Sequence, residues 1–533
     1  MTDVRTGPIQ STFNSTPQTG MQQAPEHLFI LFGATGDLAR RKLYPALLRL
    51  WNEKRLPNKF ALLGIARRPY HHDSFREQIR QAIEEFAPSA MPVAGDWQAF
   101  LERAYYCSAD ATKPEDFPAV ASLVKKLEAE QGIPTHRLFY LAMAPELFAP
   151  VADQLQASGL TDLGDAPVEN DRQAPWKRLI IEKPFGRDRT SAEILNQALR
   201  RVFAETEIFR IDHYLGKEMV QNIEVLRFAN ALFEPIWNHR NIASVQITSS
   251  ETVGVEERAA YYDKAGALRD MVQNHVLQMV MMMAMEPPSR LKVEAIRDEK
   301  VKVLRSLRTL KEEEVYQHVV RGQYRGGSMW GQAVQSYRKE PGVQPQSSTE
   351  TFVAARLFID NFRWTGVPFY LRTGKRMATK ATEIVVQFHN MPNHLYFNPE
   401  GQLQPNLLSI QVSPKEGISI RINAKQPGTD AVVVPVVMDF CQQTESPEAY
   451  ERLLLDAMHG DATFFTRWDE VQLAWKFVDP IADAFTDHRL PLEPYAAGTW
   501  GPAVATQLPV AEGYQWWPLS TQTHEEGLLH EPI

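Results

Sequence analysis

The sequence predicts an α/β Rossmann-type parallel-sheet domain followed by an α+β domain with a large, mainly antiparallel sheet. From Glu26 to about residue 210, short apolar runs alternate with helical periods, which is typical of a parallel sheet covered by helices on both faces. Beyond residue 210, several β-like runs follow one another without a helix between them, and such strands pair antiparallel. We therefore assign residues 26–210 to the first domain and 211–533 to the second. Residues 1–25, rich in Gln, Thr, Ser and Pro, are predicted to be a disordered tail.

Length, charge and cysteine content narrow the class of protein. The 533 residues suffice for two large domains, and 57 Lys and Arg against 65 Asp and Glu leave a net charge of −8. An acidic body disfavours nucleic acid and anionic membranes as partners, and no apolar segment is long enough to span a bilayer. The only two cysteines, Cys107 and Cys441, form no metal-binding spacing, so we expect a reducing, cytoplasmic location.

The elements of the first domain follow one another regularly. Apolar runs predict strands at 27–33, 60–66, 104–110, 137–143, 176–184 and 207–214. The 3.6-residue periods between them predict helices at 37–50, 74–86, 114–131 and 191–203, with Asp73 as the N-cap of the second helix.

The second domain begins with a predicted helix at 217–230, followed by a strand at 243–251 and another helix at 268–285. Further strands are expected at 369–374, 382–390, 407–412 and 418–424. With few helices among so many strands, we expect the helices to lie on one side of the sheet.

The first strand runs directly into GATGDLA, a variant of the dinucleotide-binding fingerprint. Gly33 and Gly36 allow a tight turn and close approach of the backbone to a pyrophosphate at the following helix N-terminus. The second strand ends in Arg67 with no acidic residue, and a guanidinium suits the 2′-phosphate of NADP, to which Thr35 could add a hydroxyl. We predict NADP in preference to NAD; in the alternative interpretation, such arginines only solvate a loop.

Two later segments concentrate chemically active side chains. Lys183 follows a strand directly in IEKPFGRD, and RIDHYLGKEMVQN places Asp212, His213, Tyr214 and Lys217 within six residues. If the strand continues, Asp212 and His213 face opposite sides and serve different tasks. His213, Tyr214 and Lys217, near a helix N-terminus, form a candidate phosphate site, although the segment could instead be a charged junction that caps the helix.

A third segment, LRDMVQNHVLQMV, contains His275 on an apolar helical stripe. Such a histidine points inward and is more often structural than catalytic. It becomes a general base if a carboxylate orients the ring and stabilises the imidazolium, and Asp212 is the candidate for that carboxylate.

Four segments, in this order along the chain, resemble glucose-6-phosphate dehydrogenases: GATGDLARRKLYPAL, IEKPFGRD, RIDHYLGKEMVQN and RDMVQNHVLQ. The resemblance extends from about Leu28 to the C-terminal region and covers nearly all the chain beyond the tail. It implies an NADP-dependent oxidoreductase that converts glucose 6-phosphate into 6-phosphoglucono-lactone, the entry step of the pentose phosphate pathway. It also implies that the first domain binds NADP and the second binds substrate and forms a homodimer or homotetramer.

The resemblance also assigns roles to particular residues. His275 would be the general base for the C1 hydroxyl, Asp212 would hold its ring, and Lys183 would lie between the sugar and the nicotinamide. The remaining substrate-binding residues would be His213, Tyr214, Lys217, Glu251, Asp270, Lys375 and Lys380. The cofactor-binding residues would be Gly33, Thr35, Gly36, Asp37, Leu38, Lys42, Arg67 and Lys183. The reaction needs a base, a hydride acceptor and fixed geometry, so we expect no metal.

Departures from the family pattern leave the catalytic groups in place. Ala259 and Ala260 stand where the family often has glycine. Ser413 stands where some members have a glutamine of a second, structural NADP site, and this departure argues against that site here. Two alternatives remain open: a dehydrogenase of unphosphorylated sugars, and a non-catalytic NADP-binding sensor or scaffold.

Overall fold

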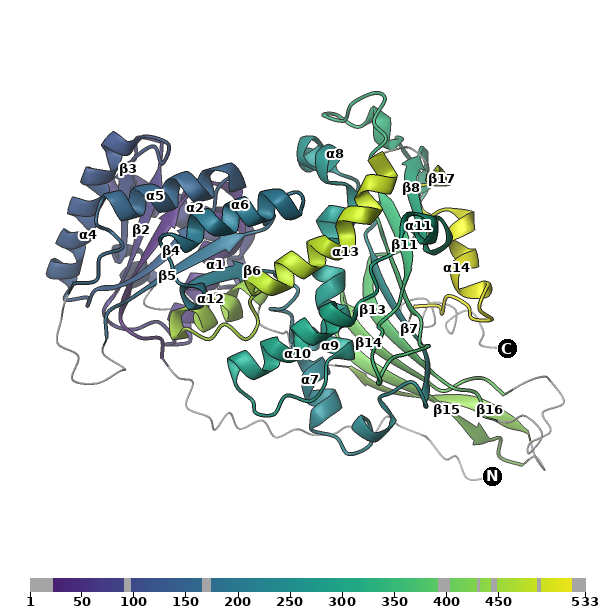
Figure 1. Cartoon of the computed structure of the whole chain (residues 1–533). Coiled ribbons are helices and arrows are strands. Elements are labelled where there is room, and N and C mark those ends of the chain that lie inside the picture. Colours follow the sequence, from purple (N-terminus) through teal and green to yellow (C-terminus); the bar gives the residue numbers. More distant parts are fainter. Residues whose placement is uncertain are drawn as a thin grey trace, which may run out of the picture.

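The computed structural model describes residues 23–90, 97–164, 174–391, 403–428, 432–441, 448–486 and 490–519. These residues form two bodies, each built on one large sheet (Figure 1). Residues 1–22, most of the predicted disordered tail, lie outside the described residues. Ala24, which also belongs to the predicted tail, is described by the structure and is buried. Its amide donates a 2.8 Å hydrogen bond to the carbonyl of Arg55.

The first sheet has six parallel strands in the order β3-β2-β1-β4-β5-β6, as the strand–helix alternation predicts. Its strands are β1 (His27–Phe32), β2 (Phe60–Ala66), β3 (Ala104–Ser108), β4 (His136–Leu141), β5 (Trp176–Glu182) and β6 (Ile208–Ile211). Every side chain of β1 and β4 is buried, because helices cover both faces of the sheet.

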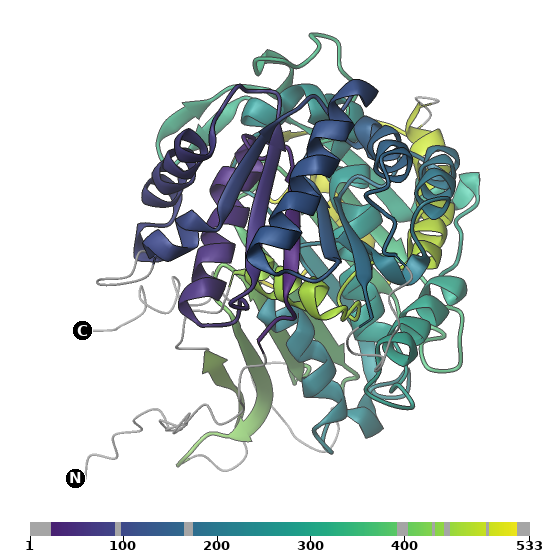
Figure 2. The same cartoon turned by 90° about the vertical axis from the view of Figure 1, so that its left-hand side faces the viewer.

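The four helices predicted for this domain are present, and the structure adds two that were not predicted, α3 (Trp97–Glu102) and α5 (Phe148–Ala157). The other four are α1 (Tyr44–Asn52), α2 (His72–Phe86), α4 (Phe117–Gln131) and α6 (Arg189–Arg200). Figure 2 faces this domain and shows helices in front of its strands. The predicted N-cap Asp73 is wrong: His71 is the N-cap of α2, and its amide donates to the Ser74 hydroxyl. The first predicted helix begins as a π-helix, η1 (Ala39–Leu43), and continues as α1.

A helix from far along the chain completes the first domain. α12 (Ala449–His459) packs beside α1, and Leu453 and Leu454 share a buried apolar cluster with Leu47. From β5, Arg178 donates to the carbonyls of the last turn of α12, at 2.6 Å for Met458. The predicted boundary at residue 210 did not anticipate this return of the chain.

The second sheet has nine strands in the order β16-β15-β14-β13-β7-β12-β11-β8-β17. The pairs β7–β12 and β8–β17 are parallel and the others antiparallel, which confirms a mainly antiparallel sheet. Its strands are β7 (Ile242–Ser250), β8 (Val319–Arg325), β11 (Phe352–Leu357), β12 (Phe369–Gly374), β13 (Ala381–Phe388), β14 (Leu407–Ser413), β15 (Gly417–Lys425), β16 (Val433–Cys441) and β17 (Leu492–Ala496). A small separate hairpin consists of β9 (Gly327–Met329) and β10 (Gln332–Val334).

Long helices cover the face of this sheet that is directed toward the first domain (Figure 1). The helices of the second half are α7 (Glu218–Phe228), α8 (Ala259–Ala267), the π-helix η9 (Leu268–Val276), α9 (Leu277–Ala284), α10 (Val293–Ser306), α11 (Glu312–His318), α13 (Trp468–Thr486) and α14 (Gln507–Val510). The C-terminal segment reaches polar side chains of the sheet, where the Trp517 indole donates to Gln387 at 2.9 Å.

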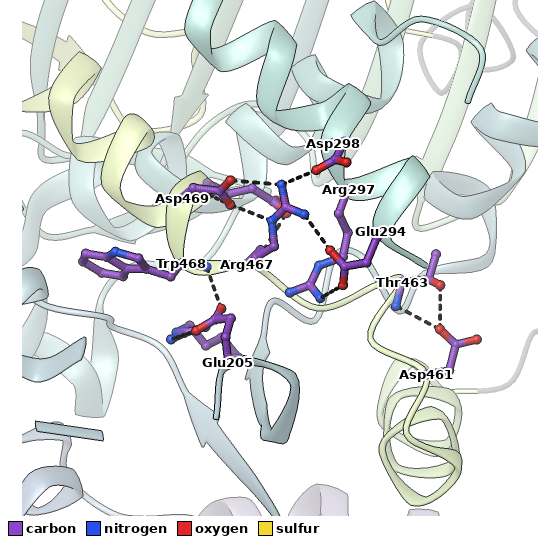
Figure 3. A network of polar contacts seen from close by, with 11 residues as sticks. Glu205, Glu294, Arg297, Asp298, Asp461, Thr463, Arg467, Trp468 and Asp469 are labelled. Atoms are coloured by element: carbon purple, nitrogen blue, oxygen red, sulfur yellow. Dashed lines mark hydrogen bonds and ion pairs between the residues drawn. The ribbon is translucent and has the colours of Figure 1, made fainter. Parts of the chain in front are cut away.

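A network of charges joins the two bodies near the start of α13 (Figure 3). The Arg467 guanidinium donates to Glu294 and Asp298 of α10, at 2.7 Å each. The amide of Trp468 donates at 2.9 Å to Glu205, which belongs to the first domain. The segment between α12 and α13 is therefore tied to both bodies.

Candidate active site

The fingerprint loop follows β1 and turns closely against the end of β4. Gly33 has φ +79°, and a Cβ atom there would lie 2.1 Å from the carbonyl oxygen of Ala142. The Gly36 amide donates to the Gly33 carbonyl at 2.9 Å. Only glycine fits at position 33, because both the backbone angle and the neighbouring strand exclude a side chain. The loop backbone thus has the close packing that a dinucleotide site requires.

The predicted cofactor side chains surround this loop. Thr35 lies in the turn, and Leu38 directly precedes η1. Asp37 forms an ion pair with Arg41, with 2.6 Å between Oδ1 and Nε. Lys42 pairs with Glu448, directly before α12, at 2.9 Å.

Arg67 follows the end of β2 and is exposed. Within the described part of the chain it forms no hydrogen bond or ion pair. Its guanidinium is therefore available to an anionic ligand.

His275 and Asp212 come together although 63 residues separate them. His275 Nδ1 and Asp212 Oδ1 are 2.5 Å apart, and the two residues are only 1% and 2% exposed. The predicted opposite orientation of Asp212 and His213 is wrong, because β6 ends at Ile211 and the chain then turns. The His213 ring lies 4.6 Å from the His275 ring, centroid to centroid.

The electrostatics of this pair suit proton transfer. Burial lowers the pKa of His275 below its ordinary value although Asp212 acts in the opposite direction, so the ring is neutral near pH 7. Burial alone would raise the pKa of Asp212, but His275, His213 and Lys183 together lower it below its ordinary value. Asp212 is therefore an anion that accepts a hydrogen bond from the Nδ1–H group, which leaves the Nε2 lone pair as the basic site.

Lys183 directly follows β5 and occupies that basic site. Its Nζ lies 2.6 Å from His275 Nε2 and 2.8 Å from the carbonyl oxygen of Asp270.

The helix that carries His275 differs from the predicted one. His275 is buried, so its predicted inward orientation is correct, but its helix is the π-helix η9 and not a regular α-helix. In a π-helix the hydrogen bonds run from i to i+5, so the predicted 3.6-residue stripe does not describe this segment.

The structure also brings together His213, Tyr214 and Lys217. The Tyr214 ring stacks on His275 at 4.3 Å, and Lys217 Nζ lies 4.6 Å above the Tyr214 ring. Lys217 is the N-cap of α7, so its side chain lies where backbone N–H groups are free. The Tyr214 hydroxyl is already within 3.1 Å of the Ser249 hydroxyl, which leaves its ring to face the site.

Burial lowers the pKa of Lys217, and the positive charge of Lys380 contributes in the same direction. Lys380 is exposed at the start of β13. The two lysines therefore lie near each other, and the carboxylate of Glu416 acts on the pKa of Lys217 in the opposite direction.

The acidic residues predicted to hold sugar hydroxyls lie on two different elements. Glu251 directly follows β7 and is ion-paired with Lys375, which directly follows β12. Asp270 on η9 accepts from Lys183 at 3.4 Å and from Arg258 at 3.2 Å.

Four residues near the site were missed from the sequence. Arg258 neutralises Asp270, and Glu182 accepts hydrogen bonds from Tyr140 and Tyr450. The position of Glu182 next to Lys183 could have indicated it. No local signal connects Tyr450, in α12, with this region.

One potential ligand atom from each of Asp212, His213 and His275 lies within 4.8 Å of the other two, a spacing compatible with a metal ion. Both ring nitrogens of His275, however, are already engaged by Asp212 and Lys183. We therefore assign no metal ligand here, and the arrangement suits proton transfer better.

A dinucleotide loop in a parallel sheet and a buried, neutral histidine oriented by a carboxylate define the class of nicotinamide-dependent dehydrogenases. Comparisons with known proteins identify the family within this class. Residues 30–222 match the model for the glucose-6-phosphate dehydrogenase NAD binding domain, and residues 224–517 match the model for the glucose-6-phosphate dehydrogenase C-terminal domain. The chain belongs to the glucose-6-phosphate dehydrogenase family.

Individual relatives agree over nearly the whole chain. Glucose-6-phosphate 1-dehydrogenase of Bacillus subtilis is 48% identical over 499 residues, covering 93% of this chain and 99% of the relative. The Treponema pallidum enzyme is 42% identical over 504 residues, covering 93% and 96%.

Solved structures show the same similarity. A glucose-6-phosphate dehydrogenase in complex with glucose 6-phosphate superposes with a TM-score of 0.82 at 33% identity, covering 93% of this chain and 99% of that one. The Mycobacterium avium enzyme gives a TM-score of 0.78 at 33% identity, with the same coverage. The chain is thus an oxidoreductase with a nicotinamide-nucleotide domain, and the sensor alternative is not supported. Among the helices that the structure describes, none has the length and apolar character needed to cross a membrane.

Proposed function

We propose that this enzyme oxidises glucose 6-phosphate at C1 to 6-phosphoglucono-lactone, with NADP as its cofactor. The observation that carries the proposal is the buried contact of His275 with Asp212, beside Lys183, in a chain of this family. His275 Nε2 takes the proton of the C1 hydroxyl once the substrate displaces Lys183 from it. Asp212 stabilises the imidazolium that results. When bound, the nicotinamide supplies the hydride acceptor.

The other side chains bind and orient. Lys183, released from His275, remains within reach of the substrate C1 oxygen and of Asp270. Lys217, with His213, Tyr214 and Lys380, supplies positive charge and donors for the 6-phosphate at the start of α7. Glu251, Asp270 and Lys375 hold sugar hydroxyls. This division favours the phosphorylated sugar over free glucose.

The assignment of His275 is tested by His275→Asn. We expect kcat to fall by about 10³-fold or more, the contribution of a general base together with its charge partner, while glucose 6-phosphate still binds. Isothermal titration of the sugar phosphate measures binding independently of turnover. Turnover within tenfold of the wild type would disprove the base assignment.

The preference for NADP rests on Arg67, an exposed guanidinium directly after β2, at a strand end whose sequence has no acidic residue. Its loss in Arg67→Ala should lower kcat/KM for NADP about 10- to 100-fold, the effect of one charge-assisted contact, and leave kcat/KM for NAD almost unchanged. Arg200→Ala, which removes an exposed guanidinium from α6, is the matched control. Equal losses with both cofactors would contradict a 2′-phosphate contact.

We also propose that the enzyme is a cytoplasmic homodimer or homotetramer. β16 is an edge strand of the nine-stranded sheet, and several of its apolar side chains are exposed, 55% for Val437 and 53% for Met438. Such an edge pairs readily with another chain. Light scattering should give a molar mass that is a multiple of 60.7 kDa. Val437→Lys places a charge on this edge and should lower the measured mass of the assembly. A wild-type monomer would refute this assembly.

A further inference from the structure

Lys375, proposed above to hold sugar hydroxyls, lies where the chain leaves the second sheet and turns sharply. β11 and β12 are paired along their full lengths, and one further hydrogen bond joins the Lys375 amide to the Thr351 carbonyl at 2.9 Å. The next residue, Arg376, has φ +51°, in the left-handed region that residues other than glycine rarely adopt. Neighbouring segments must therefore hold residues 375–378, which we call the lysine turn.

The end of β17 and the residues that follow it are hydrogen-bonded to the lysine turn. The Tyr495 hydroxyl donates to the Lys375 carbonyl at 2.7 Å and lies 3.2 Å from the Thr351 carbonyl. The Gly498 amide and the Thr499 carbonyl bond to the backbone of the same turn, at 2.8 and 3.0 Å. Of these bonds, the one from Tyr495 comes from a side chain, so a substitution can remove it while the backbone bonds remain.

Tyr495 is itself held firmly by its surroundings. It is 4% exposed, and its ring lies 5.7 Å from the Phe352 ring and 6.3 Å from the Tyr324 ring, centroid to centroid. The Thr351 hydroxyl accepts from the Tyr324 amide at 3.0 Å and lies 2.9 Å from the Tyr495 hydroxyl, to which it can donate. The Tyr495 hydroxyl is then left to donate to Lys375, and its packed ring fixes the position of that carbonyl.

The side chain of Lys375 depends on the conformation of the lysine turn. Lys375 is 6% exposed, and its ammonium forms an ion pair with Glu251 and lies 5.5 Å above the Tyr262 ring. On this side the turn is joined to the chain after β7, because the Met377 amide donates to the Glu251 carbonyl at 2.9 Å. A shift of the Lys375 backbone would therefore move the ammonium relative to its partner in the site.

We propose that Tyr495 is a positioning residue that sets the affinity for glucose 6-phosphate by holding Lys375 in place. This proposal rests on the function assigned above to Lys375. Tyr495 acts through the backbone of the lysine turn, on the second domain. Its loss should therefore weaken the hold on the sugar more than it slows proton removal by His275, and it should leave the NADP site of the first domain unchanged.

Tyr495→Phe removes the hydroxyl and keeps the packed ring. The KM for glucose 6-phosphate should rise about 5- to 10-fold, the effect of one lost hydrogen bond that positions a binding group. We expect kcat to change by less than about threefold and the KM for NADP to stay within about twofold. An unchanged KM for glucose 6-phosphate, or equal rises in both KM values, would overturn the proposal.

Tyr337→Phe is the matched control. Tyr337 is fully buried in the same apolar cluster as Tyr495, and its hydroxyl donates to Asp263 at 2.8 Å. The control loses a comparable buried hydrogen bond and should lower the melting temperature to a similar extent, with both KM values within about twofold of the wild type. A rise in the KM for glucose 6-phosphate as large as in Tyr495→Phe would assign the effect to loosened packing and overturn the proposal.

A double variant tests whether Tyr495 acts through the lysine. Once Lys375→Met has removed the ammonium, the turn no longer positions a charge for the substrate. Adding Tyr495→Phe to Lys375→Met should then change kcat/KM for glucose 6-phosphate by less than about twofold. A further loss of about 5- to 10-fold in the double variant would place the action of Tyr495 elsewhere and refute the proposal.

Hydrogen exchange without substrate separates this proposal from the proposed function. The Lys375 amide is bonded beside the Tyr495 hydroxyl, so peptides that contain the lysine turn should exchange about 3- to 10-fold faster in Tyr495→Phe than in the wild type or in Tyr337→Phe. A protein that shows this difference but does not oxidise glucose 6-phosphate would refute the proposed function and leave the positioning of Lys375 standing. An active enzyme whose turn exchanges equally in all three forms would refute the role of Tyr495 alone.

Discussion

Replacement of Asp212 by Asn changes the charge beside His275 while keeping the shape of the side chain. Asp212 Oδ1 accepts from His275 Nδ1 at 2.5 Å and from the Tyr214 amide at 3.0 Å, and an Asn carbonyl oxygen can accept both. The other carboxylate oxygen is buried and has no hydrogen-bond partner among the described residues. The substitution therefore removes the negative charge and places an unpartnered NH₂ group at the second oxygen position.

The magnitude follows from the separation and burial of the two groups. At a charge separation of about 4 Å and an effective dielectric constant of about 20, a carboxylate stabilises an imidazolium by about 4 kcal/mol. The side chains of His275 and Asp212 are 1% and 2% exposed, so solvent does little to screen this interaction. Because the imidazolium forms only as the proton is removed, the loss raises the barrier and kcat should fall about 10³-fold. The buried NH₂ should cost a further 1–2 kcal/mol or so of folding stability.

The assay is steady-state NADPH formation with Asp212→Asn, His275→Asn and the double variant. The KM for glucose 6-phosphate should change by no more than about threefold, because the structure gives Asp212 no contact with a predicted substrate group other than His275 and the Tyr214 amide. The double variant should be no slower than His275→Asn alone, since Asp212 acts only through the ring. A fall of less than tenfold in Asp212→Asn, or additive losses in the double variant, would refute this reasoning.

Three further predictions concern the fold around the site. Arg467→Met removes the cation that Asp298 and Asp469 share with Glu294; because these carboxylates are partly exposed, we expect a loss of about 1–2 kcal/mol in urea unfolding, and an unchanged free energy of unfolding would show that the network is dispensable. Gly33→Ala places a Cβ atom 2.1 Å from the Ala142 carbonyl at φ +79°, so NADP binding should be lost in calorimetry, and normal affinity would contradict the close approach of the loop. Burial lowers the pKa of His27 to about 4, so the folded protein keeps this ring neutral. The resulting contribution to the free energy of unfolding is complete above pH 6.5, and about 3 kcal/mol of it is lost as the pH falls from 6.5 to 4. His27→Gln should flatten the pH dependence of the melting temperature across this range, and an unchanged slope would exclude His27 as its source.

Much of the fold could be read from the sequence because its signals are local. The runs HLFILF and FALLGIA are buried strands, and the helical periods between such runs require a parallel sheet. The position of Lys183 directly after β5 follows from local pattern, and so does the inward orientation of His275 among apolar residues, although its helix is a π-helix. Element ends were less predictable: the α2 cap at His71 and the π-helical start of the first helix depend on hydrogen bonds that residue type alone does not specify.

The sequence by itself determined the two-domain α/β and α+β architecture and the residue types needed for dehydrogenation, through periodicity and motif. Only the tertiary structure decided which of those residues meet. Asp212 reaches His275 because β6 ends one residue earlier and the chain turns, and Tyr450 reaches Glu182 because α12 crosses back to the first sheet. Contacts across 63 and 268 residues arise from the burial of apolar faces that pack many elements at once, and no local pattern in the chain encodes them.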